Sequence, residues 1–322
     1  MSNNNKLVSV LIPSYNHEKY VGDCLESVLA QTYSNIEVII CDDKSKDNTY
    51  EVIERYRQRL EEKFSRICII ENDNNLGIVK NCNKLISLAK GDYYKLLASD
   101  DMLRPDGIEK LVFFLESHKE HNMVYSYGDR IGENITFKDV VGNSINNPIK
   151  YSSVSGKSIT SQLMAENFIL APSVLIPKGT VERWGVFSEE FIFEDWEYWL
   201  RVSVDGSIGY LDESTTYYRD LETSASRFIK KDRDRYEKFI DNELKLLDRY
   251  KEYITYESKY KFLKNKLRQA CSVEDIKYIG KIRNIMMEED IKVSIKDRLL
   301  ILLAKLRIYD KVKRVYRKFV KK

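Results

Sequence analysis

The sequence predicts an α/β fold in which a mostly parallel sheet is flanked by helices and followed by a helical C-terminal region. Across the first 130 residues, short uninterrupted apolar runs alternate with segments whose apolar residues recur at helical spacing. Uninterrupted apolar strands separated by helices are typical of a parallel sheet covered on both faces. Beyond about Arg227 the chain becomes charged and helical and contains no further proline. We therefore expect two domains, residues 1–228 and residues 229–322.

Five apolar runs and the segments between them give the expected order of elements. Strands are expected at residues 8–12, 36–41, 67–70, 93–97 and 123–127, and helices at residues 20–31, 47–60 and 79–89 and from about Pro105. Residues 132–160 are rich in Asn, Ser and Gly, which favours a long loop or irregular excursion. Helical spacing resumes over residues 159–168.

The net charge is small but unevenly distributed. The 322 residues hold 53 Lys and Arg against 50 Asp and Glu, a net charge of +3. Residues 305–322 contain nine basic residues and one acid, a net +8, which leaves −5 for the rest of the chain. A mildly acidic body with a basic tail argues against general nucleic-acid binding and favours one local anionic partner, such as a lipid surface.

The basic tail also has the spacing of an amphipathic helix. Its apolar residues recur every three or four positions, with Lys and Arg between them: Leu302, Leu306, Tyr309, Val312, Tyr316 and Phe319. This pattern predicts a helix on an anionic membrane surface, which we favour, or one packed on the catalytic domain or a partner subunit.

The cellular location is predicted from other features of the sequence: five cysteines without a paired motif, a polar start and only short apolar stretches in the tail. They predict a cytoplasmic location, peripheral on the inner face of the cell membrane.

Polar and acidic residues follow three of the expected strands. Ser14-Tyr15-Asn16 follows the first, Asp42-Asp43 the second and Asp100-Asp101 the fourth. Parallel sheets bind ligands outside the carboxyl ends of their strands. Asp42-Asp43 suits hydrogen bonds to a nucleobase or ribose, and Asp100-Asp101 suits a divalent cation on a diphosphate, because Mg²⁺ takes carboxylate oxygens together with substrate phosphates. Turn chemistry is the alternative, equally good for Asp100-Asp101 and better for Asp42-Asp43 taken alone.

A third acid pair, Glu194-Asp195, lies among aromatic residues that include Trp196 and Trp199. Partial desolvation raises the pKa of such a carboxyl toward a value useful for a general base. We favour this function over an exposed acid at the start of a helix. The two Trp residues are expected in the core.

Basic side chains give weaker signals. Lys80 lies near the start of a helix, where a cation and free N–H groups can meet a phosphate, although a solvated lysine is the commoner explanation. His17, His118 and His121 have no metal-ligand spacing with the acids. They are expected to be surface or loop residues.

Four segments resemble glycosyltransferase family 2, and they occur in the order of that family. They contain VSVLIPSYN in residues 8–49, ASDDMLRPD in residues 75–106, APSVLIPKG at residues 171–179 and FEDWEYWLR in residues 184–201. Each motif alone is weak, but four in order are specific. The resemblance implies the GT-A fold and an inverting, metal-dependent transferase. Such an enzyme would move a sugar from a nucleotide diphosphate, expected to be UDP, to an acceptor hydroxyl.

The resemblance also implies a role for each matching residue. Pro13 and Tyr15 would line the nucleobase pocket, and Asp43 would hydrogen-bond the base. Asp101 would touch a bound Mn²⁺ or Mg²⁺, and Asp100 would reach the ribose or the metal. The acceptor would be a saccharide or lipid-linked saccharide, in the synthesis of cell-surface polysaccharide or glycolipid.

Asp195 would then be the general base in a single displacement that inverts the anomeric carbon. Two departures bear on metal binding: Ala98 stands where the family often has Asp, and Leu221, within residues 218–222, stands where it often has His. They leave a degenerate sugar-nucleotide-binding module as an alternative. A nucleotidyltransferase ranks lower, because Pro13-Ser14-Tyr15-Asn16 occupies the place of the basic Gly-rich loop that it needs.

Overall fold

The computed structural model describes residues 6–142, 147–149, 159–221, 232–307 and 309. Contacts divide the chain into two compact units, one of residues 1–159 and 167–228 and the other of residues 160–166 and 229–322. The expected boundary between residues 228 and 229 lies outside the described residues, as does most of the tail beyond Arg307. The domain boundary and the amphipathic helix of the tail therefore stay predictions.

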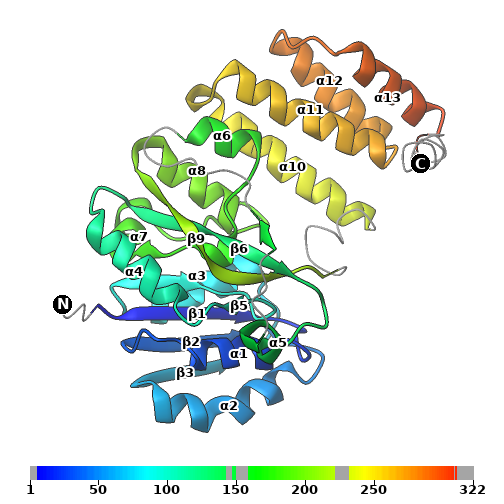
Figure 1. The fold of residues 1–322 in the computed structure, drawn as a ribbon. Helices are drawn as coiled ribbons and strands as arrows, with labels where there is room; N and C mark the ends of the chain where they lie inside the picture. The colour runs from blue at the N-terminus through cyan, green and yellow to red at the C-terminus, as the bar shows by residue number, and fades with distance from the viewer. Residues whose placement is uncertain (1–5, 143–146, 150–158, 222–231, 308, 310–322) are drawn as a thin grey trace. The chain divides into compact units, whose positions relative to one another are not determined.

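A five-stranded sheet forms the centre of the first unit (Figure 1). All of its pairs are parallel except β4 with β8. The chain runs outward from β1 to β3 and then returns to place β4 on the other side of β1. The prediction of a mostly parallel sheet is confirmed, with its switch point at the carboxyl ends of β1 and β4. In spatial order the strands are β3 (Arg66–Glu71), β2 (Ile36–Asp42), β1 (Val8–Ser14), β4 (Tyr93–Leu96) and β8 (Ile176–Pro177).

Apolar packing explains why these segments form the sheet and its helices. Every residue of β1 and β2 is buried, which accounts for their mostly apolar sequences. One face of α1 is buried through Val21, Cys24, Leu25 and Val28, and it shares a core with these strands and with α2 and α4. The helices of this unit are α1 (Val21–Leu29), α2 (Thr49–Lys63), α3 (Ile78–Leu88), α4 (Gly107–Ser117), α5 (Phe137–Gly142), α7 (Lys178–Trp184) and α8 (Asp195–Asp205), with a 3-10 turn η1 (Ala171–Ser173).

A second sheet has the order β5-β9-β6-β7, with β9 and β6 parallel and the other pairs antiparallel. Helix α5 and strand β7 lie where an irregular excursion was expected, so that prediction is wrong for these residues. Phe137 and Val140 of α5 pack on Met102 and Ile131, and this burial outweighs the loop-like composition. The strands are β5 (Met102–Leu103), β6 (Met123–Ile131), β7 (Pro148–Ile149) and β9 (Ile208–Arg219).

The second unit is helical, as the sequence predicts, and it includes α6, which lies among the residues of the first unit in sequence. Four of its helices begin at a side chain that accepts the N–H three residues later: Asp232, Thr255, Asp275 and Ser294. None of the described helices is long and apolar enough to cross a membrane. The elements are α6 (Thr160–Ala165), α10 (Arg233–Tyr250), η2 (Lys251–Tyr253), α11 (Tyr256–Ser272), α12 (Ile276–Glu288) and α13 (Ile295–Lys305).

A buried carboxylate, Glu37, ties the amino ends of the central strands together. It accepts hydrogen bonds from the Ser9 hydroxyl (2.5 Å) and from the N–H groups of Lys90 (2.6 Å) and Gly91 (3.1 Å), and it pairs with Arg66. Burial alone would raise the pKa of Glu37, but these bonds outweigh it and hold the pKa below its usual range. The turn needs glycine at position 91, because a Cβ there would stand 2.5 Å from the Ser9 hydroxyl oxygen.

We expect Glu37→Gln to lower the free energy of unfolding by about 1.5–3 kcal/mol at neutral pH, since it removes the charged acceptor. The pKa is lower in the folded state, so this contribution is present above the unfolded value of about 4.3 and is lost as the pH falls through the folded value. Urea unfolding at several pH values measures it. Glu61→Gln, at an exposed ion pair with Arg57, is the control and should cost less than about 1 kcal/mol. Equal losses in the two variants would contradict the assignment.

Candidate functional site

The carboxyl ends of β1, β2 and β4 form one edge of the sheet, here called the rim. The Asp43 N–H donates to the Ser14 carbonyl (2.8 Å), and the Leu97 N–H donates to the Leu11 carbonyl (3.0 Å). These bonds place Asp43 on one side of the end of β1 and the segment leading to Asp100-Asp101 on the other. The rim therefore brings together the acid pairs that follow β2 and β4.

Asp43 is buried and its carboxylate organises the turn before α3. Oδ1 accepts the Leu76 N–H and the Asn72 amide, both at 2.8 Å, and Oδ2 accepts the Gly77 N–H at 2.8 Å. Gly77 has φ +82°, a conformation that favours glycine. The neighbouring Asp42 instead accepts the N–H and hydroxyl of Ser45. Asp43 thus has a defined structural role in addition to any contact with a ligand.

The Asp100-Asp101 pair is unequally exposed. Asp101 is almost fully buried, and Asp100 is partly exposed. Burial, followed by the charge of Asp100, raises the pKa of Asp101 well above its usual value, and the nearby Arg219 only partly offsets this. A divalent cation would compensate the same burial by supplying the missing positive charge.

Arg219, the last residue of β9, holds the acid pair in place. Its N–H donates to Asp101 Oδ1 and its Nε to the Asp100 carbonyl, both at 2.8 Å. Its Nη1 donates to the carbonyls of Glu133 (2.8 Å) and Ile135 (2.6 Å). Sequence reasoning considered this segment only for Leu221, which is buried, and missed Arg219. The available signal was a cation two residues before the position where the family often has His.

His17 is a second rim residue, one that the sequence analysis expected only as a surface or loop residue. Its Nδ1 lies 2.8 Å from the Ser99 hydroxyl and 3.9 Å from Asp100 Oδ1. The only sequence signal was its place just after the first strand. His17 therefore places an imidazole beside the more exposed acid of the pair.

Glu194 and Asp195 stand at the start of α8, partly buried among aromatic side chains. Asp195 accepts its helix's Trp196 N–H (2.6 Å) and the Asn167 amide (3.0 Å). Burial raises the pKa of Asp195, and these two bonds offset it only in part. Burial and then Asp195 raise the pKa of Glu194 to about 8. Within this pair, Asp195 also accepts the two hydrogen bonds that favour its charged form.

Asn167, 28 residues before Asp195 in the sequence, was also missed. Its Nδ2 donates to Asp195, while its buried Oδ1 has no hydrogen-bond partner among the described residues. The Ser14 hydroxyl at the end of β1 is likewise buried without a partner in the described part of the chain. Unpaired buried polar atoms are rare and call for an explanation, such as a ligand.

Helix α3 links the rim to the segment that precedes the Glu194-Asp195 pair. It begins beside Asp43, and its Asn83 both donates to the Phe187 carbonyl (2.9 Å) and accepts the Phe187 N–H (3.0 Å). Cys82 is buried within this helix. Burial raises its pKa first, followed by the charges of Glu194, Asp195 and Asp43. Carboxyl groups that are far apart in the sequence therefore lie near enough to Cys82 to raise its pKa.

The remaining predicted residues lie as follows. Pro13 is buried in β1 and Tyr15 is exposed just beyond it. Lys80 is exposed on α3 with its Nζ 3.9 Å from a carboxylate oxygen of Glu189. Trp196 and Trp199 are buried in the core, as expected. The contacts of Pro13, Tyr15 and Lys80 with a ligand stay predictions.

The acid pair at residues 100 and 101 fits a metal held jointly with a ligand. No group of three or more His, Cys, Asp or Glu side chains that could hold a metal occurs among the described residues. Two carboxylates are the usual protein share of a Mg²⁺ site that substrate phosphates complete. The burial of the Asp101 carboxyl group, which a cation would compensate, agrees with such a site.

Comparison with known sequences places the chain in a family. Residues 9–163 match the family described as Glycosyl transferase family 2. The chain is 27% identical over 218 residues, 66% of its length and 65% of the relative's, to an uncharacterized glycosyltransferase of Haemophilus influenzae. It is 37% identical over 124 residues, 38% of its length and 46% of the relative's, to the Escherichia coli UDP-Glc:alpha-D-GlcNAc-diphosphoundecaprenol beta-1,3-glucosyltransferase WfaP. The matches thus span less than two thirds of either relative.

Two solved structures share the fold. Residues 1-349 of TarS from S. aureus, in complex with UDP-GlcNAc, match with a TM-score of 0.56 and 18% identity, over 97% of this chain and 92% of that one. The mannosyltransferase PcManGT from Pyrobaculum calidifontis, in complex with GDP-Man and Mn²⁺, matches with a TM-score of 0.59 and 15% identity, over 97% and 88%. Residues 9–163 therefore belong to glycosyltransferase family 2, and the chain shares the GT-A fold of these structures.

Proposed function

We propose that the chain transfers a sugar from a nucleotide diphosphate to an acceptor hydroxyl with inversion, in polysaccharide or glycolipid synthesis. The observation that carries the proposal is the linkage of Asp43, at the rim, to Glu194-Asp195 through α3. TarS and PcManGT were solved with nucleotide-diphosphate sugars, and WfaP is named for UDP-Glc, which supports this donor class and favours UDP. The acceptor is a saccharide or lipid-linked saccharide.

The donor would bind along the rim. Pro13 and Tyr15 contact the nucleobase, and Asp43 offers its carboxylate to a donor group of the base. The buried Ser14 hydroxyl, unpaired within the described residues, is available to the same ligand. Lys80 would leave its weak contact with Glu189 for a phosphate oxygen, a small cost because both side chains are more than half exposed.

Asp101 and Asp100 would hold Mn²⁺ or Mg²⁺ together with the diphosphate, with Asp100 also within reach of the ribose. Such an ion stabilises the negative charge that develops on the departing nucleoside diphosphate. Ala98 stands where the family often has an aspartate, so this chain offers one carboxylate fewer and relies more on the diphosphate oxygens to coordinate the metal. Arg219 keeps both acids oriented through their backbone and side-chain oxygens.

Asp195 would accept the proton of the acceptor hydroxyl as that oxygen attacks the anomeric carbon. The proton moves to a carboxylate oxygen of Asp195, and the bond to the diphosphate oxygen breaks on the opposite face. The raised pKa makes Asp195 a stronger base than an exposed aspartate. Asn167 positions this carboxylate, and its unpaired Oδ1 is available to a hydroxyl of the acceptor.

Asp195→Asn should lower turnover by about 10²–10⁴-fold, because it removes the proton acceptor, and leave donor binding nearly unchanged. Glu194→Gln is the matched control. It replaces a carboxyl that is protonated at neutral pH with a neutral isostere, so we expect less than about tenfold loss. Sugar transfer from UDP-sugars with Mn²⁺ or Mg²⁺, and donor binding by calorimetry, measure both. Near-normal turnover in Asp195→Asn would refute the base assignment, and donor binding without transfer by the native chain would favour the binding module.

Asn167→Leu should move the acid limb of the kcat/KM profile to higher pH. A base works in its ionised form, and loss of the Asn167 hydrogen bond raises the pKa of Asp195 further. Gln162→Leu, at an exposed amide on α6, is the control. A lower rate with an unmoved acid limb would show that Asn167 only supports the fold.

Mn²⁺ should bind weakly to the protein alone and much more tightly with UDP present, since only two protein carboxylates are offered. Asp101→Asn keeps the oxygen that accepts the Arg219 N–H, and it should weaken Mn²⁺ binding in the presence of UDP by more than about tenfold. Electron paramagnetic resonance of free Mn²⁺ measures this independently of activity. Unchanged Mn²⁺ binding in the variant would place the metal elsewhere.

A further inference from the structure

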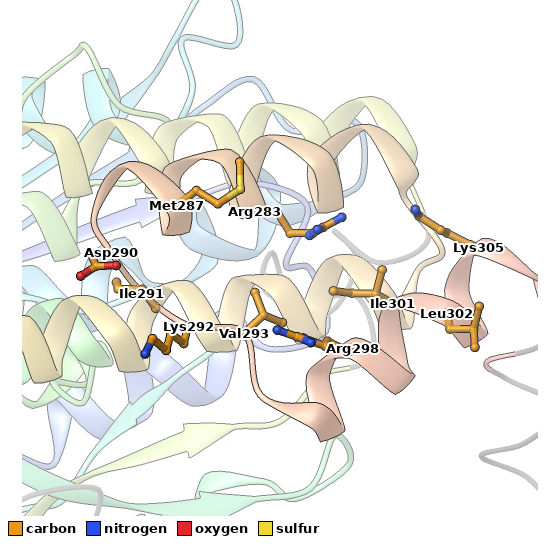
Figure 2. A pocket seen from close by; sticks show the side chains of 10 residues that line it. All are labelled: Arg283, Met287, Asp290, Ile291, Lys292, Val293, Arg298, Ile301, Leu302 and Lys305. Carbon is orange, nitrogen blue, oxygen red and sulfur yellow. The ribbon is translucent and has the colours of Figure 1, made fainter.

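The helical unit contains a cavity of about 610 Å³ between α12, the connection at residues 289–294 and α13 (Figure 2). Four of its lining side chains are cations and one is an acid. In the view of Figure 2, Asp290 lies at one end of the cavity and Lys305 at the other. The charged residues are Arg283, Lys292, Arg298, Lys305 and Asp290.

The four cations have no acidic partner within the described residues, whereas several other cations of the same unit have one. Elsewhere in the unit, Lys266 pairs with Glu243, Arg268 with Asp297 at 2.9 Å, and Lys277 with Glu237 at 2.7 Å. Like charges gathered without partners repel one another and create a positive potential. The cavity therefore favours an anionic ligand.

Apolar side chains beside the cavity narrow the class of ligand. Ile295, Leu299, Leu302 and Leu306 recur at helical spacing and are 86%, 55%, 51% and 58% exposed. They form a stripe, whereas Ile301 and other residues on the opposite face of α13 are buried. A small soluble anion would leave this stripe in water. An anion with an attached hydrocarbon chain would cover it.

We propose that this cavity and the exposed stripe of α13 bind an anionic phospholipid of a membrane surface, with its phosphate among the four cations and its acyl chains along the stripe. The proposal does not depend on the reaction catalysed by the first unit. The sequence beyond the cavity supports it, because residues 306–322 add eight basic residues and one acid. Asp290 opposes the anion, but it is outnumbered by the cations.

The test compares binding of the full chain to vesicles of phosphatidylcholine alone and of phosphatidylcholine mixed with phosphatidylglycerol. Arg298→Gln/Lys305→Gln should weaken binding to the anionic vesicles roughly 30-fold, since each basic side chain near such a surface contributes about one factor of five. Arg55→Gln/Lys90→Gln removes the same charge from exposed positions of the first unit and should bind as the native chain does. The tail beyond Arg307 is present in every variant, so the difference reports the cavity.

Leu299→Ser, at a side chain that contributes little to the core, should also weaken vesicle binding while circular dichroism stays unchanged. Equal binding by the two charge variants, or equal binding to neutral and anionic vesicles, would overturn the proposal. Inorganic phosphate that displaces the vesicles more than chloride of equal ionic strength would assign the cavity to a soluble anion and overturn it too.

Discussion

A carboxylate withdrawn from water must be given hydrogen-bond donors, and the loops around the rim are folded to supply them. Asp43 takes donors from the turn before α3, Asp101 from the end of β9, and Asp195 from its own helix and from Asn167. Asp43 and Asp101 thereby draw distant segments to the edge of the sheet, and Asp195 draws in the segment that carries Asn167. The requirement that folds these loops is also the one that positions the acids.

The three carboxyl groups accept different numbers of hydrogen bonds, and this difference suits them to different chemical roles. Among the described residues, the carboxylate of Asp43 receives three hydrogen-bond donors, that of Asp195 two, and that of Asp101 one, a backbone N–H. A buried carboxylate with few hydrogen-bond donors is stabilised most by a nearby cation. A buried carboxylate with some donors remains able to accept a proton. This order agrees with a metal at Asp101, a base at Asp195 and a mainly hydrogen-bonding role for Asp43.

The sequence predicted what depends on local pattern. Uninterrupted apolar runs identify β1 to β4, and acids directly after them identify the rim, because parallel strands end together. Partners at long range have no such signal: Arg219 meets Asp101 across 118 residues and Asn167 meets Asp195 across 28. Helical spacing likewise predicts α6 but not its unit, since the choice of neighbour depends on tertiary packing.

The helical unit follows a different electrostatic rule from the rim. Several of its charges neutralise one another in pairs, whereas the four cations that line the cavity have no acidic partner within the described residues, and their mutual repulsion costs stability. The exposed apolar stripe beside them costs solubility in the same way. Both costs are offset if an anionic amphiphile covers them. A transferase with a soluble acceptor gains nothing from such a surface. One whose acceptor is attached to a lipid gains a higher effective concentration of acceptor, because both are confined to one membrane face.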